Sequence, residues 1–191
     1  MVMGIVYVLG PGGQYNHLIV RRIAELNQSA RLRSMVTPIS ELQDGTCVII
    51  GGGPGRIALG GPVSNNIEGI LRKGSLPVLG ICYGHQLIAH ILGGKVVEAR
   101  KPEFGPATLE VLVHDTLFEG LPEHFRVWMS HNDEVGMLPP RFVQLARSED
   151  CEFQAMKDAQ GGIYGIQFHV EVEHTEHGRE ILLNFITASR R

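Results

Sequence analysis

The chain has few cysteines, little excess charge and no long apolar stretch, and each absence narrows the classes of protein to which it can belong. Its 17 lysines and arginines and 20 aspartates and glutamates give a formal charge of −3, so bulk charge provides no attraction to nucleic acid or anionic membranes. Three cysteines are a sparse and odd set for a disulfide framework, so we expect a reducing, cytoplasmic environment. The apolar residues 1–10 are too short for a membrane span and lack a basic segment, so they predict a buried strand.

Apolar runs alternate with segments of helical periodicity in the first half, which is typical of a parallel sheet covered by helices. Strands are expected there at 4–9, 31–36, 46–50 and 77–81, and helices at 14–26, 63–72 and 84–92. From Lys95 onward we expect short strands at 96–99, 107–113, 125–129, 142–146, 153–156 and 163–168, then a helix at 175–188. We therefore predict one domain over 1–191 with an α/β, flavodoxin-like, doubly wound fold. Its central sheet is mainly parallel, with helices on both faces and a small antiparallel region in the second half.

Cys82 is the residue whose surroundings point most strongly to chemistry. It lies between Gly80 and Gly84, after an apolar run and before a segment of helical pattern, which predicts the strand–turn–helix of a nucleophile elbow. Glycines are needed beside such a turn because its backbone is strained and leaves no room for a neighbouring β-carbon. Cys47 lies in an apolar strand, and Cys151 has acidic neighbours that disfavour a thiolate, so both are predicted to be structural.

A base and a carboxylate follow the last predicted strand. His169 and Glu171 are two residues apart, so in an extended strand their side chains share one face. With Cys82 they provide a nucleophile, its base and the group that orients the base. A zinc site using His174 and His177 is an alternative. That interpretation lacks closed ligand spacing and leaves Cys82 unexplained, so no metal is predicted, and both histidines are placed on the surface, where they can face a partner.

The glycine-rich segment 51–55 has two interpretations. It lacks both the Gly-Lys-Ser/Thr ending of a phosphate loop and the spacing of a dinucleotide fingerprint. The preferred interpretation is an oxyanion hole, in which the backbone amides of Gly53 and Tyr83 converge on the intermediate formed at Cys82.

Three ordered motifs resemble those of the class I glutamine amidotransferases, and the resemblance covers almost the whole chain. They are Gly-Gly-Pro at 52–54, Gly-Ile-Cys-Tyr-Gly-His-Gln at 80–86 and Gly-Ile-Gln-Phe-His-x-Glu at 165–171. Shorter matches at 103–105, 128–135 and 171–175 are similar to the GMP synthetase branch of that family. One residue departs from the family pattern, because Val170 replaces the usual proline. Valine also favours extended backbone, so we expect the geometry to survive with less rigidity.

The resemblance implies hydrolysis of glutamine to glutamate and ammonia by Cys82, His169 and Glu171. It also implies that Gln86 and the backbone at Ser130 and His131 hold the α-amino and α-carboxylate ends of glutamine. Residues with possible signalling roles toward a partner are Asp133 and His174.

No ATP-pyrophosphatase phosphate loop occurs in the sequence. The resemblance therefore implies that this chain carries no cofactor and that ATP and Mg²⁺ bind to a separate synthetase subunit, which aminates xanthosine monophosphate (XMP) to GMP. Three alternatives stay open. They are a glutaminase subunit for anthranilate or aminodeoxychorismate synthesis, a non-catalytic regulatory module on the same fold, and a cysteine peptidase on a related fold.

Overall fold

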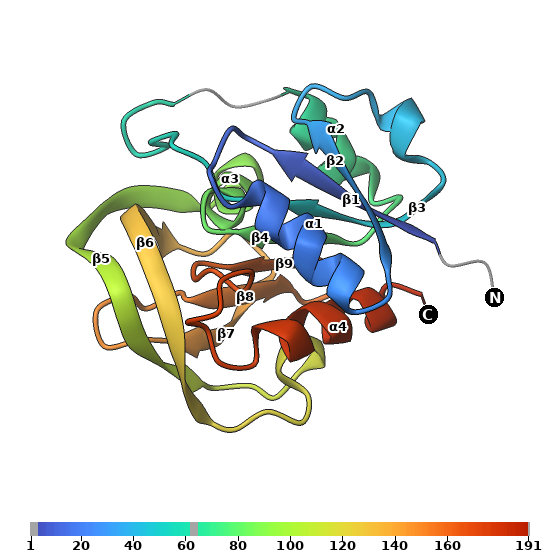
Figure 1. Ribbon diagram of the computed structural model, residues 1–191. Coiled ribbons are helices and arrows are strands. Elements are labelled where there is room, and N and C mark those ends of the chain that lie inside the picture. The colour runs from blue at the N-terminus through green and yellow to red at the C-terminus, as the bar shows by residue number, and fades with distance from the viewer. Residues whose placement is uncertain (1–3, 62–64, 191) are drawn as a thin grey trace.

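A computed structural model describes residues 4–61 and 65–190, and in those ranges nine strands form one mixed sheet (Figure 1). The strands are β1 Ile5–Gly10, β2 Ser29–Ser34, β3 Gly45–Ile50, β4 Val78–Ile81, β5 Lys95–Val111, β6 His124–Met137, β7 Phe142–Arg147, β8 Ala155–Asp158 and β9 Ile163–Ile166. The helices are α1 Asn16–Glu25, α2 Asn65–Lys73, α3 Tyr83–Ile91 and α4 Gly178–Ala188, with 3₁₀ turns η1 Ile39–Leu42 and η2 Thr116–Phe118. The strand order is β2-β1-β3-β4-β9-β8-β7-β5-β6.

The first part of the sheet is parallel, as predicted. Strands β2, β1, β3, β4 and β9 pair in parallel, and all four residues of β4 are buried. Apolar side chains of α1 and α4 pack in one core cluster, and those of α2 and α3 pack in the other. Figure 1 shows α1 and α4 in front of the sheet and α3 behind it. Burial of β1, β3, β4 and β9 on both faces explains their apolar sequences and confirms the α/β class, whereas the edge strand β2 is largely polar and has no buried residue.

The antiparallel part is larger than predicted, and the expectation of a small region of short strands was wrong. Four of the described strand pairs are antiparallel, and β5 alone is 17 residues long. Two separate strands were expected at 96–99 and 107–113, but β5 runs through the interval between them, with a register shift between Glu98 and Glu103. Pro102 lies within this register shift, and Pro106 pairs with Trp128 of β6 where no described strand pairs on the other side of β5, an edge position that tolerates proline.

The starts of two predicted helices need comment. The helix expected at 63–72 is found at Asn65–Lys73, and residues 63 and 64 lie outside the described residues. The final helix begins at Gly178, not at 175, because His177 adopts a left-handed backbone with φ of 58°. No helix among residues 4–61 and 65–190 is long and apolar enough to span a bilayer.

Candidate functional site

Cys82 lies in the sharp turn between β4 and α3. Its φ of 53° and ψ of −105° are strained for a residue other than glycine. A β-carbon on Gly80 would lie 2.4 Å from the Gly84 carbonyl carbon, and one on Gly84 would lie 2.2 Å from the Ile50 carbonyl oxygen. The two glycines are therefore required by close backbone contact, and the turn places Cys82 at the carboxyl end of a central parallel strand.

His169 and Glu171 lie beyond the sheet, so the expectation that they share a strand face was wrong. Strand β9 ends at Ile166, and the chain then bends. The bend is held in place because the His169 amide donates to the Trp128 carbonyl at 3.0 Å and the Thr175 hydroxyl donates to the His169 carbonyl. The two side chains nevertheless meet, with His169 Nδ1 2.7 Å from Glu171 Oε1, and both are buried.

The side chains of Cys82 and His169 are neighbours across Gly52. A β-carbon on Gly52 would lie 3.1 Å from His169 Cε1 and 3.7 Å from Cys82 Cβ. Burial by itself lowers the pKa of His169, but the charge of Glu171 and the hydrogen bonds to Cys82 and Glu171 outweigh it and raise that pKa well above its usual value. With Nδ1 facing Glu171, the other ring nitrogen remains for Cys82, an arrangement that suits proton transfer to and from the sulfur.

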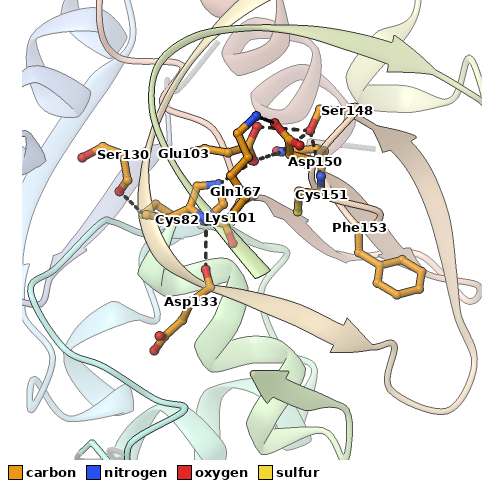
Figure 2. Close-up of polar contacts among 12 residues, drawn as sticks. Cys82, Lys101, Glu103, Ser130, Asp133, Ser148, Asp150, Cys151, Phe153 and Gln167 are labelled. Carbon is orange, nitrogen blue, oxygen red and sulfur yellow. Dashed lines mark hydrogen bonds and ion pairs between the residues drawn. The ribbon is translucent and has the colours of Figure 1, made fainter. Parts of the chain in front are cut away.

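Two cavities meet at Cys82. One, of about 400 Å³, is lined by 12–15, 52–54, Cys82, Ser130 and His169. The other, of about 210 Å³, is lined by 53–56, Cys82, Tyr83, Gln86, Phe104 and 130–133. The predicted oxyanion residues Gly53 and Tyr83 both line the smaller cavity with Cys82. Figure 2 shows the sulfur directed toward the carbonyl of Ser130, 3.6 Å away.

The residues predicted to hold the substrate lie around the smaller cavity. Buried Gln86 donates through Nε2 to the Asp133 carbonyl at 2.6 Å and to Gln167 Oε1 at 3.0 Å. Ser130 lines both cavities. The ring of His131 is buried and bonded to Glu103 Oε2 at 3.0 Å, so its backbone is the part suited to contact a ligand.

The residues with predicted signalling roles occupy different environments. Asp133 is buried, and its carboxylate accepts from Arg56 Nε at 2.6 Å and from the Ala58 amide at 3.1 Å. His174 is exposed and packs on Trp128 with ring centroids 4.6 Å apart. His174 and His177 both precede α4, so the two histidines of the zinc interpretation do not lie on a helix. Residues 4–61 and 65–190 contain no group of three His, Cys, Asp or Glu side chains that could hold a metal.

The other two cysteines are buried away from this arrangement. Burial raises the pKa of the Cys47 thiol to about 12. Burial and the nearby carboxylates of Glu134 and Glu103 raise the pKa of Cys151 as well. Both thiols therefore stay protonated at neutral pH, as expected of structural cysteines.

Sequence reasoning missed the side chains that α1 and the loop before it contribute. The ring of Tyr15 stands edge-on to His169 with centroids 5.4 Å apart. Asn16 donates to the carbonyls of Gly13 and Gly52 at 3.0 and 3.1 Å, and Arg22 Nε donates to the Glu171 carbonyl at 3.0 Å. The position of this loop in the sequence could have indicated its role. The loop follows β1, and ligand sites gather at the carboxyl ends of parallel strands.

The chain is similar to known proteins over nearly its full length. The family model for glutamine amidotransferase class-I matches residues 8–188. A glutamine-hydrolysing GMP synthase subunit of Pyrococcus abyssi is 43% identical over 186 residues, which cover 95% of this chain and 96% of that protein. The subunit of the same name from Sulfurisphaera tokodaii is 42% identical and is covered over 100% of both chains. A crystal structure of a candidate GMP synthase subunit from Thermoplasma acidophilum is 36% identical, with a TM-score of 0.91 over 99% of this chain and 95% of that one.

Proposed function

The chain belongs to the class I glutamine amidotransferase family, and from this membership and the site geometry we propose that it is the glutaminase subunit of a two-subunit GMP synthase. The observation that carries the proposal is the meeting of Cys82, His169 and Glu171 beside one cavity in a chain that matches such subunits from end to end. We further propose that residues 1–191 form a single amidotransferase domain that works in the cytoplasm.

The first half of the proposed reaction forms a thioester. His169 takes the Cys82 thiol proton, and Glu171 stabilises the resulting imidazolium. The thiolate attacks the side-chain carboxamide carbon of glutamine, and the amides of Gly53 and Tyr83 donate to the oxyanion. Removing one such donor typically costs about 3 kcal/mol of transition-state stabilisation. His169 then protonates the amide nitrogen, the carbon–nitrogen bond breaks, and ammonia leaves.

The second half restores the enzyme. His169 takes a proton from water, the hydroxide attacks the thioester carbon, and the carbon–sulfur bond breaks to release glutamate. We assign the smaller cavity to the α-amino and α-carboxylate ends of glutamine, held by Gln86 and by the backbone at Ser130 and His131. Val170 is buried and its carbonyl is closely packed against Gly178, so packing keeps the triad segment in place without the family's proline.

The partner in this proposal is a synthetase subunit that binds ATP, Mg²⁺ and XMP, and this chain needs no cofactor of its own. Ammonia is protonated readily in water, so the partner must dock where ammonia leaves the site. The Pyrococcus and Sulfurisphaera proteins are each named as one subunit of a GMP synthase, which supports the existence of a second. His174 is exposed next to the segment that carries His169 and Glu171, and we propose that it contacts the partner. Asp133 is buried, so it would influence the partner only indirectly, through the segment that contains Arg56.

The proposal predicts glutamine-dependent GMP formation when the chain is combined with a GMP synthase synthetase subunit, ATP, Mg²⁺ and XMP. Glutamate and GMP are measured together, and we expect them in about equal amounts, with neither formed from glutamine when the chain is omitted. Ammonium salt in place of glutamine is the control, because it should support the partner alone. GMP formed from ammonium but not from glutamine plus the chain would contradict the proposed function.

A further inference from the structure

The segment after β3 carries Gly53, which the proposed mechanism uses, and Arg56, which it does not. This segment is closely surrounded. A β-carbon on Gly53 would lie 2.8 Å from the Pro11 side chain, and one on Gly55 would lie 2.6 Å from the Tyr83 ring. The Gly53 amide therefore keeps its place relative to Cys82 only while the whole segment stays in this packing.

Arg56 attaches this segment to the β5–β6 hairpin. Its Nε donates to Asp133 Oδ1 at 2.6 Å, and its Nη2 donates to Glu98 Oε1 at 2.9 Å. The Ala58 amide donates to the second carboxylate oxygen of Asp133 at 3.1 Å. Both oxygens of a buried carboxylate are thus bonded to one short stretch of chain, and such charge-assisted bonds are about twice as strong as neutral ones.

The two acidic partners of Arg56 lie directly opposite each other in the sheet. Glu98 on β5 and Asp133 on β6 are register partners, so their side chains share a face. Like charges in that relation destabilise a sheet unless a cation lies between them. Among the described residues, Arg56 is the cation that pairs with both. The β5–β6 hairpin therefore presents two neighbouring carboxylates, and Arg56 from the segment after β3 forms an ion pair with each of them.

Asp133 also contacts the helix that follows Cys82. In Figure 2 its backbone carbonyl lies on the side toward Cys82 and its carboxylate points away. That carbonyl accepts from Gln86 Nε2 on α3 at 2.6 Å. One residue thus joins the Gly53 segment, through its carboxylate, to the helix behind the nucleophile, through its carbonyl.

We propose that Arg56 is a positioning residue, whose ion pairs with Asp133 and Glu98 hold the Gly53 amide in place for the oxyanion. The inference rests on the proposed function, since it concerns the same reaction. The amide acts mainly on the transition state, so misplacing it lowers kcat and leaves KM for glutamine little changed. A displacement of about 1 Å in such a group can cost about 100-fold in rate.

The test compares R56M and R56K with R147M in the complex with the synthetase subunit, ATP and XMP. Arg147 is the matched control, because its guanidinium also donates two hydrogen bonds to carboxylate oxygens, here both of Glu110, but it lines neither cavity at Cys82. R56K keeps the charge, which favours folding, but its single ammonium lacks the fork that reaches both carboxylates. Glutamine turnover is divided by the number of Cys82 sites that a diazoketone analogue of glutamine titrates, so that unfolded protein is not counted.

We expect kcat per titrated site to fall about 100-fold in R56M and about 10-fold in R56K, with KM within about twofold and R147M unchanged. If R56M does not fold, the kcat per titrated site of R56K alone tests the positioning role. Wild-type turnover per site in R56K, or a loss in R147M equal to that in R56K, would overturn the positioning role and leave the proposed function standing. A wild-type complex that forms no glutamate would overturn both.

Discussion

Replacement of Cys82 by alanine is expected to lower glutamine hydrolysis by about 10⁴-fold or more, the scale seen when a covalent nucleophile is removed. No other thiol can take over, because Cys47 and Cys151 are buried and their pKa values are raised. Glutamate release is measured with the synthetase subunit, ATP and XMP present. Amination of XMP with added ammonium should continue, because that step belongs to the partner.

The control for this variant is Cys47→Ala, which removes a buried thiol on β3. Its turnover is expected to stay within about twofold of wild type, since a small core truncation changes stability and not the site. Glutamine hydrolysis that survives in Cys82→Ala, or that is lost equally in Cys47→Ala, would show that the nucleophile is not Cys82.

The second large effect is expected for Gly84→Ala, two residues beyond the nucleophile. The new methyl group would lie 2.2 Å from the Ile50 carbonyl oxygen, and both are backbone-anchored, so β3 and α3 must move apart. We expect the free energy of unfolding to fall by about 3 kcal/mol, the upper part of the range for overpacking, and glutamine turnover to fall with it as Cys82 is displaced. Urea unfolding gives the first quantity and glutamate release the second.

Gly69→Ala is the matched control, because Gly69 lies within α2 and a β-carbon there meets no atom within 4 Å. Alanine in a helix is favoured over glycine, so a gain of about 0.5–1 kcal/mol is expected. Equal unfolding free energies for the two variants would mean that the close approach of Gly84 to β3 does not stabilise the turn at Cys82.

The parallel half and the elbow were predictable because local patterns determine them. Apolar strands buried on both faces have a continuous apolar signature, and the glycines around Cys82 mark a turn that few other residues can make. A close approach of His169 and Glu171 was also expected, although the reason given for it, a shared strand face, was wrong. The structure brings Glu171 to His169 through a bend held by Thr175, not through the alternation of a strand.

What the sequence did not predict depends on long-range pairing. The length of β5 is set by its register with β6, and that pairing carries the strand through residues 100–106, where no strand was expected. Arg56 gave no sequence signal, because its two carboxylate partners lie 42 and 77 residues away. The side chain of His131 is turned toward Glu103 by the same hairpin, which no local pattern encodes.

Nuclear magnetic resonance titration of the His169 imidazole tests the central claim, that Cys82, His169 and Glu171 act as one unit. In the wild-type chain the His169 pKa should lie well above 6.5, because Glu171 and Cys82 together outweigh burial. It should fall in Cys82→Ala, and it should also fall in Glu171→Gln, where burial opposes the charged ring without a facing carboxylate. An ordinary His169 pKa that is the same in all three proteins would contradict the claim.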